Sequence, residues 1–130
     1  ARATSGVEVA VVEGAGGWRV PLHPEGFLSD LADRLELDVI LVVGLRLGCL
    51  NHARLTAEAI ERSGRCRLAG WVGNHVDPGF ARVEDNVASL ERLLGSPPLA
   101  VIPMLDAPSA ERASRYLANT RTRVALGIGP

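Results

Sequence analysis

The sequence predicts a single α/β domain in which a mostly parallel sheet lies between two layers of helices. Two observations carry this prediction. Short apolar, β-branched segments alternate along the chain with longer segments whose apolar residues recur at helical spacing. The strand segments are apolar at consecutive positions, as strands covered on both faces must be. No repeat, low-complexity tract or linker divides the chain, so one domain is expected over residues 1–130.

Runs of apolar and β-branched residues predict the strands. Residues 39–43 form the most apolar run, opened by Asp38 and closed by Gly44, so we expect this strand to be central in the sheet. Strands joined through helices imply right-handed crossovers and therefore parallel pairing. The other predicted strands are residues 7–12, which lead into a glycine cluster, residues 67–74, residues 99–102 and, at the edge of the sheet, residues 124–126.

Apolar residues spaced three or four apart predict four helices. Gly64 and Gly95 end two of them, because glycine adopts the left-handed conformation found at many helix ends. Ser109 begins another, since its hydroxyl can accept a hydrogen bond from a free N–H of the first turn. The predicted helices cover residues 27–35, 48–64, 83–94 and 109–117.

Charge and hydropathy exclude two classes of function. The formal net charge is -1 and the basic residues are scattered, so a nucleic-acid-binding protein is not expected. The longest apolar run, residues 39–45, is far shorter than the ~20 residues that a membrane-spanning helix needs. We therefore expect neither a nucleic-acid partner nor a membrane span.

The cysteine spacing and the absence of lysine indicate the redox compartment and exclude one phosphate-binding motif. Cys49 and Cys66 lie too far apart for a redox or zinc motif, so a reduced, cytoplasmic protein is expected. All 14 basic residues are arginine, and the chain has no lysine. A phosphate-binding loop of the Walker A type, which requires lysine, is therefore absent from this sequence.

Candidate functional residues follow the predicted strands, because open parallel sheets bind ligands beyond the carboxyl ends of their strands. Glu13 is followed by Gly14, Ala15, Gly16 and Gly17, which would let a phosphate approach the backbone while the carboxylate binds Mg²⁺. The alternative is an ordinary glycine-rich turn after a buried strand.

Residues 46–52 pass from a strand end directly into a helix, whose free N–H groups can bind a carboxylate or phosphate. Judged from the residues alone, the favoured alternative is a capped helix start, with Asn51 bonded to its own backbone and Cys49 buried. Asn74 also ends a strand, and its amide can donate to and accept from an adenine edge, although asparagine is common in turns. Pro103 follows the next strand and leaves neighbouring carbonyls free to accept hydrogen bonds.

Taken in order, these segments resemble the C-terminal half of dethiobiotin synthetases. The resemblance is carried by Val12-Glu-Gly-Ala-Gly-Gly-Trp18, by Val39-Ile-Leu-Val-Val-Gly-Leu-Arg-Leu-Gly-Cys-Leu-Asn-His-Ala53, by Leu68-Ala-Gly-Trp-Val-Gly-Asn74 and by Ile102-Pro103. It implies a three-layer αβα fold of the P-loop NTPase type and an ATP- and Mg²⁺-dependent ligase. Such an enzyme converts 7,8-diaminononanoate and CO₂ to dethiobiotin by closing a ureido ring.

The resemblance also implies roles for individual residues. Glu13 would bind Mg²⁺, and the phosphates of ATP would lie along Gly14, Ala15 and Gly16. Across a homodimer interface, the carboxylate of the diamine would bind to Leu47, Gly48, Cys49, Leu50 and Asn51. The adenine would lie against Asn74 and His75 and along the backbone of Pro103, Met104 and Leu105. An acidic nucleotide contact of the family, near Asp106 to Glu111, has no assignment here.

The main departure from the family is the absence of its phosphate loop, its catalytic lysines and a further Mg²⁺-binding aspartate. In the family these precede the segment at residues 7–12, and the strand before the phosphate loop lies inside the sheet. We therefore expect a portion of a longer protein that is inactive alone and has a gap beside its sheet. One alternative is a non-catalytic module that dimerises or binds nucleotide. Another is an amide ligase of cobalamin synthesis, against which the string at residues 47–52 argues.

Overall fold

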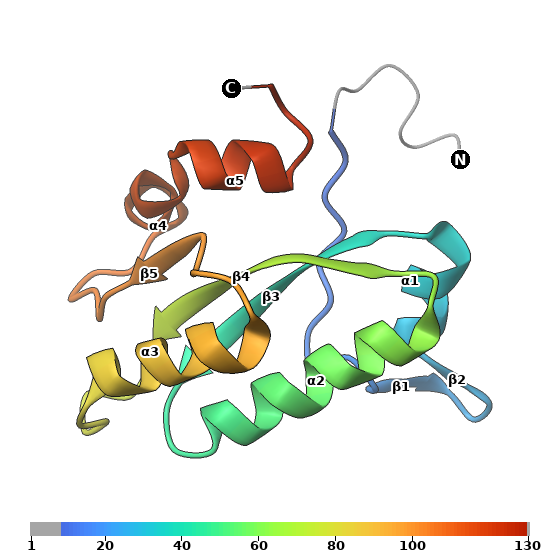
Figure 1. Ribbon diagram of the computed structural model, residues 1–130, viewed down its shortest axis with the longest axis horizontal. Coiled ribbons are helices and arrows are strands. Elements are labelled where there is room, and N and C mark those ends of the chain that lie inside the picture. Colours follow the sequence, from blue (N-terminus) through green and yellow to red (C-terminus); the bar gives the residue numbers. More distant parts are fainter. Residues whose placement is uncertain (1–8, 130) are drawn as a thin grey trace.

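A three-stranded parallel sheet forms the centre of the structure, a computed structural model that describes residues 9–129 (Figure 1). Its strands are β3 (Asp38–Leu45), β4 (Arg67–His75) and β5 (Ala100–Ile102), in the order β3-β4-β5. β3 and β4 pair in parallel along their whole length, and β5 pairs with the last part of β4. The predicted α/β class with a parallel sheet is confirmed.

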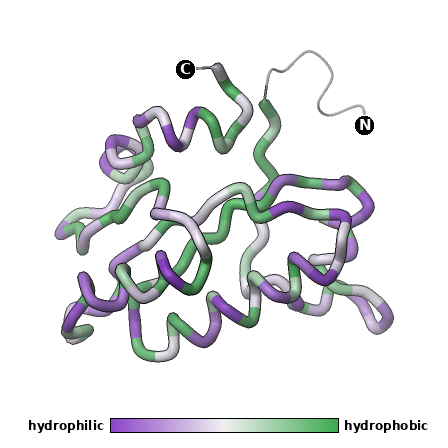
Figure 2. Tube along the Cα trace, viewed as in Figure 1, coloured by the Kyte–Doolittle hydropathy of each residue, from purple (hydrophilic) through white to green (hydrophobic). Residues whose placement is uncertain are grey.

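Helices cover both faces of this sheet, which gives the predicted three layers (Figure 1). On one face, α2 (Cys49–Ser63) and α3 (Val83–Leu94) pack on a core that includes Leu45, Trp71 and Leu90. On the other face, α4 (Ala110–Leu117) and α5 (Thr120–Ala125) pack on a second core built around Val72 and Ile102. Figure 2 shows apolar residues concentrated along the strands and polar residues on the outer sides of the helices.

The helix boundaries follow the local signals expected from the sequence. Gly64 and Gly95 end α2 and α3 in the left-handed conformation, with φ of 65° and 72°. Ser109 begins α4, and its Oγ accepts a hydrogen bond of 3.2 Å from the backbone N–H of Arg112. The first predicted helix is α1 (Leu28–Leu35). No helix within residues 9–129 is long and apolar enough to span a membrane.

Two predictions about the sheet are wrong. Residues 9–12 of the predicted strand 7–12 form no strand, and Val11 is 79% exposed; Val7 and Glu8 lie outside the described residues. β3 is not central, because within residues 9–129 it has only β4 as a partner. Both errors have one cause: a strand is defined by its neighbours, and among the described residues no strand lies on the other side of β3.

The predicted edge strand at residues 124–126 is also wrong, because residues 120–125 form α5 instead. Asn119 starts this helix: its Oδ1 accepts a 3.0 Å hydrogen bond from the N–H of Thr122. Its Nδ2 donates a 3.0 Å hydrogen bond to the carbonyl of Leu99, which ties the helix to the end of the sheet. A short antiparallel hairpin, β1 (Pro21–His23) and β2 (Gly26–Phe27), was not expected from the sequence.

Replacing Trp71 by phenylalanine is expected to lower the free energy of unfolding by about 1–3 kcal/mol. Trp71 is fully buried, and its Nε1 donates a 2.9 Å hydrogen bond to the carbonyl of Ser96, which the substitution would leave without a donor. Urea unfolding followed by circular dichroism measures the loss. Trp18→Phe is the matched control, because Trp18 is only partly buried, and the two variants should differ clearly. Equal losses would contradict this account.

Cys66 should make the free energy of unfolding depend on pH in the alkaline range. Burial, and then the hydrogen bond of 3.3 Å from its Sγ to Asp33 Oδ1, raise the pKa of the Cys66 thiol. A raised pKa favours the neutral thiol in the folded state, so this contribution is complete below the ordinary thiol pKa and is lost as pH rises through the raised value. Cys66→Ser keeps a donor that does not ionise in this range. Unfolding midpoints of the two proteins should therefore diverge as pH rises, and parallel pH profiles would refute the argument.

Candidate functional site

Three adjoining cavities lie around the sheet, and most of the predicted site residues line one of them. The β4–β5 cavity, about 510 Å³, lies beyond the ends of these two strands. The central cavity lies at the end of β3 beside α2, and it shares Val76 with the β4–β5 cavity. The β3-edge cavity runs along the open edge of β3 and shares Val42 and Trp18, among others, with the central cavity.

The β4–β5 cavity collects all the residues predicted to hold an adenine. Its wall on the β4 side contains Asn74 and His75, and its wall on the β5 side contains Pro103, Met104 and Leu105. The pairing of Asn74 with Ile102 sets the two strand ends side by side. The carboxamide of Asn74 is half-buried and makes no side-chain hydrogen bond to another described residue. An amide free to donate and accept therefore lines an otherwise mostly apolar cavity.

The start of α4 forms a further wall of this cavity through Ser109, Ala110 and Ala113. From the sequence, Ser109 was expected only as a helix cap, and its place in this cavity was not predicted. Val76 was missed as well, although its position two residues after Asn74 was a usable signal. His75 makes one described polar contact, between its Nε2 and the carbonyl oxygen of Asp77 at 2.9 Å.

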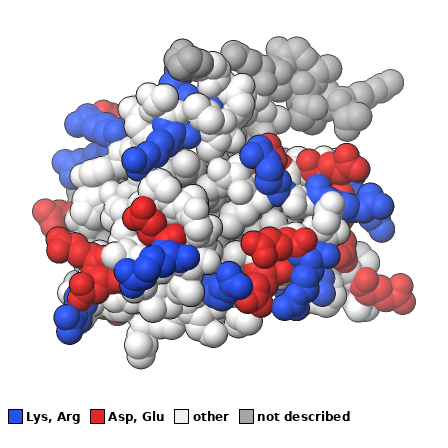
Figure 3. Space-filling view, in the orientation of Figure 1, with Lys and Arg blue, Asp and Glu red and all other residues white. Residues whose placement is uncertain are grey.

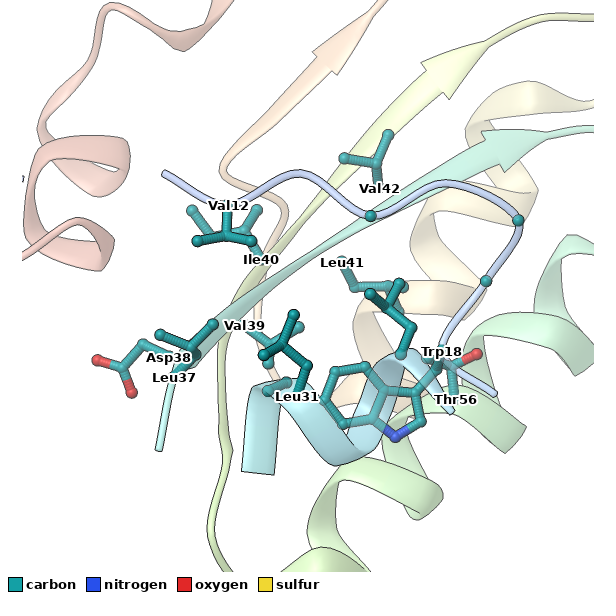
Figure 4. Close-up of a pocket in the computed structure, with 15 residues that line it drawn as sticks. Val12, Trp18, Leu31, Leu37, Asp38, Val39, Ile40, Leu41, Val42 and Thr56 are labelled. Carbon is teal, nitrogen blue, oxygen red and sulfur yellow. The ribbon is translucent and has the colours of Figure 1, made fainter. Parts of the chain in front are cut away.

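The glycine segment lies beside the β3-edge cavity, and only part of it faces inward. Gly14 and Gly16 line the cavity, whereas Glu13 and Ala15 are exposed and do not line it. An added Cβ at Gly14 would meet the end of the flexible Leu28 side chain, which would have to move, whereas Gly16 has a φ of 89°, a conformation that favours glycine. Figure 4 shows the chain that leads into this segment passing close to Ile40 of β3 at Val12.

The other wall of the β3-edge cavity is apolar. Leu31 of α1 and Trp18 point toward one another below the strand, while Val42 points away on the other side (Figure 4). Val42 is 63% exposed although it lies in the middle of β3. An exposed apolar side chain in mid-strand, beside an unpaired strand edge, marks an incompletely covered part of the sheet.

A magnesium ion fits this part of the chain only if other groups supply most of its ligands. Glu13 makes no ion pair with another described residue, and no cluster of three His, Cys, Asp or Glu side chains occurs within residues 9–129. Mg²⁺ in nucleotide sites is commonly held by one or two carboxylates together with phosphate oxygens and water. One carboxylate next to a glycine-rich backbone is compatible with that arrangement.

The segment at residues 47–51 forms the approach to α2. Gly48 precedes the helix with a φ of 89°, and the N–H of Cys49 donates a 3.0 Å hydrogen bond to the carbonyl of Arg46. Cys49 is buried, as one interpretation of the sequence expected. The same interpretation was wrong about Asn51, because no side chain caps this helix. The first turn also contains no acidic residue, so its free N–H groups remain suited to an anion.

Within the segment at residues 47–51, only Cys49 lines the central cavity. Arg46 and His52, on either side of the segment, line it too. Leu47 is 89% exposed, so this apolar side chain projects away from the chain. Gly48, Leu50 and Asn51 line none of the three cavities. The described residues therefore do not form a closed carboxylate site at this segment by themselves.

Charge is distributed without a dominant patch on the face that carries α2 and α3, where arginine and acidic side chains alternate (Figure 3). The strongest exposed ion pair lies at the opposite end of the sheet from the strand ends, where Arg67 at the start of β4 binds Asp38 with two hydrogen bonds of 2.7 and 3.0 Å. This contact holds the pKa of Asp38 below its usual value. It joins the start of β3 to the start of β4, and Asp38 also lines the β3-edge cavity together with Gly14 and Gly16.

Comparisons with known proteins agree with the resemblance expected from the sequence. Residues 3–112 match a family model described as an AAA domain. The chain is 53% identical to an ATP-dependent dethiobiotin synthetase of Chromohalobacter salexigens, covering 85% of this chain and 51% of that protein. The corresponding values are 52%, 90% and 51% for the enzyme of Ralstonia nicotianae. They are 54%, 85% and 46% for that of a Janthinobacterium species.

The chain thus spans about half the length of the curated relatives it matches. The family match covers most of the chain, including the glycine segment, the sheet and the start of α4. These are the elements whose geometry forms the three cavities. The chain belongs to the AAA domain family and is similar, over about half of their length, to ATP-dependent dethiobiotin synthetases.

Proposed function

We propose that this chain is the nucleobase- and substrate-binding portion of an ATP-dependent dethiobiotin synthetase, active as part of a longer protein. The observation that carries the proposal is the β4–β5 cavity, in which all five residues expected at the nucleobase converge: Asn74, His75, Pro103, Met104 and Leu105. The overall reaction would use ATP, Mg²⁺ and CO₂ to close a ureido ring on 7,8-diaminononanoate. An amine of the substrate becomes a carbamate, ATP phosphorylates it, and the second amine displaces phosphate.

Each part of the chain would have a defined task in this reaction. The carboxamide of Asn74 would donate to and accept from the adenine edge, and the glycine segment would let the phosphates lie against its backbone. Glu13 would bind Mg²⁺ beside the phosphates of ATP, and the ion would neutralise their negative charge. Arg46 lines the central cavity, and its fixed charge suits an anionic group there.

The open edge of β3 supports the inference that further chain completes the enzyme. The β3-edge cavity follows the backbone of residues 38–42, is lined mainly by apolar side chains and has the volume of about 360 Å³. An additional parallel strand can pair with β3 only along an unpaired edge, and the apolar surroundings of this edge suit a strand that is covered on both faces. The chain has no lysine, so the phosphate-binding loop and the catalytic lysines of this family must come from that additional segment. This chain alone would therefore be inactive.

A homodimer is part of the same proposal. The segment at residues 47–51 would bind the carboxylate of the diamine that occupies the partner's site, which suits the exposed position of Leu47 and the uncapped start of α2. Both cysteines are free, which fits a reducing, cytoplasmic location.

The alternative is a module that binds nucleotide and dimerises without catalysis. It is favoured by one observation: the β4–β5 cavity is built wholly from this chain, whereas the phosphate and metal sites are incomplete within residues 9–129. Turnover in a completed protein separates this alternative from the proposed enzyme.

Joining this chain to the first half of the Chromohalobacter salexigens relative should restore ATP-dependent ring closure. Phosphate release that depends on both 7,8-diaminononanoate and CO₂ is the measurement, with dethiobiotin detected by mass spectrometry. The chain alone should release no phosphate. A folded hybrid that binds ATP but forms no dethiobiotin would favour the non-catalytic module, and turnover by the isolated chain would contradict the need for further residues.

Asn74→Ala should weaken ATP binding by the hybrid roughly tenfold, because about one hydrogen-bonded pair with the base is lost. Titration calorimetry with ATP gives the dissociation constants. Asn86→Ala is the matched control. Asn86 lies on α3 and lines none of the three cavities, and its amide donates a hydrogen bond to the carbonyl of Arg82. If both variants bind ATP like the unmodified protein, the β4–β5 cavity is not the nucleobase site.

A further inference from the structure

We propose that His75 is a positioning residue, which uses its Nε2–H to fix the Val76 wall between the β4–β5 cavity and the central cavity. This inference rests on the proposed function, because the wall matters only if nucleotide binds beside it. The residue would act through the main chain of Asp77 and not by reading the base with Nε2.

The hydrogen-bonding chemistry determines which ring nitrogen carries the proton. The Nε2 of His75 lies 2.9 Å from the carbonyl oxygen of Asp77. A carbonyl oxygen can only accept a hydrogen bond, so Nε2 must be the donor. The neutral ring therefore has its proton on Nε2, and Nδ1 is left as an acceptor.

Asp77 is the fixed point to which His75 is attached. Its carbonyl oxygen also accepts a 3.0 Å hydrogen bond from the N–H of Phe80, and its Oδ1 accepts a 2.9 Å hydrogen bond from the N–H of Gly79. Phe80 packs against the core beneath α2 and α3. The turn is therefore joined to the folded core, and a bond from His75 to Asp77 attaches the end of β4 to it.

Val76 lies between these two attachment points. On one side, His75 pairs with Leu45 as the last residue pair of the β3–β4 ladder, and on the other side Asp77 is held by the turn. Val76 is 46% exposed, so burial does little to hold it. Its side chain nevertheless lines both cavities and lies close to Gly44, where an added Cβ would be 3.3 Å from Val76 Cγ2.

A loosened segment at Val76 would change the shape of the β4–β5 cavity even though the other predicted nucleobase residues, Asn74 and Pro103 to Leu105, are unchanged. The protein would then bind ATP less tightly, because binding would have to order the segment around Val76. The adjacent Asn74 would lose a rigid neighbour for the same reason. His75 thus contributes pre-organisation, which a conservative substitution can preserve or remove selectively.

Two substitutions at His75 separate this role from general destabilisation. His75→Gln places an amide nitrogen near the position of Nε2 and can keep the bond to Asp77, whereas the shorter side chain of His75→Asn reaches only the position of Nδ1. In the hybrid protein, His75→Asn should weaken ATP binding roughly tenfold, and His75→Gln should stay within about twofold of the unmodified protein. Equal binding by the unmodified protein and His75→Asn would overturn the inference.

Nuclear magnetic resonance tests the same bond without nucleotide. At a pH where the ring is neutral, the ¹⁵N shifts of His75 should report a proton on Nε2, and a proton on Nδ1 would contradict the geometry. Amide exchange at Phe80 should accelerate in His75→Asn and remain slow in His75→Gln. If the unmodified hybrid fails to bind ATP, the proposed function fails, while the ring tautomer and the exchange rates still decide whether His75 holds the turn.

Discussion

The parallel ladder between β3 and β4 is the constraint on which the rest of the structure depends. It runs from Asp38 with Arg67 to Leu45 with His75, and only Ala69 of β4 has no partner on β3. One irregularity between Val39 and Ile40 adjusts the register near its start. Because the two strands end together, the loops that follow them begin at the same edge of the sheet. The cavities at this edge exist because the ladder delivers both loops there.

The two faces of the ladder are covered to different extents by helices, and this difference determines which strand side chains are buried. Side chains such as Leu45 and Trp71 face α2 and α3 and are fully buried. On the opposite face, α4 and α5 cover β4 and β5 but leave Val42 on β3 exposed. Coverage therefore decreases toward the open edge of β3. The β4–β5 cavity lies on the covered side, and the glycine segment lies on the open side.

The sequence predicted best what depends on neighbours along the chain. The ends of α2 and α3 were predictable because Gly64 and Gly95 act within one turn of the helix. Asn74 and Pro103 were predicted to lie at strand ends, and they line one cavity because Asn74 lies near the end of β4 and Pro103 directly follows β5. The errors depend on distant partners. Residues 124–126 are apolar enough for a strand, but Asn119 starts a helix there by bonding both Thr122 and the carbonyl of Leu99.

The same distinction explains why only part of the site could be derived. Glu13 and its glycines follow an apolar run that resembles a strand, yet residues 9–12 pair with no strand among the described residues. Strand pairing within residues 9–129 therefore does not fix the position of that segment. Asn74 and His75 are fixed by such pairing, because they lie on β4, which β3 and β5 enclose on both sides. In the proposed function, the nucleobase site is formed within the chain and the phosphate site requires an additional strand, and this difference follows from the place of each segment in one sheet.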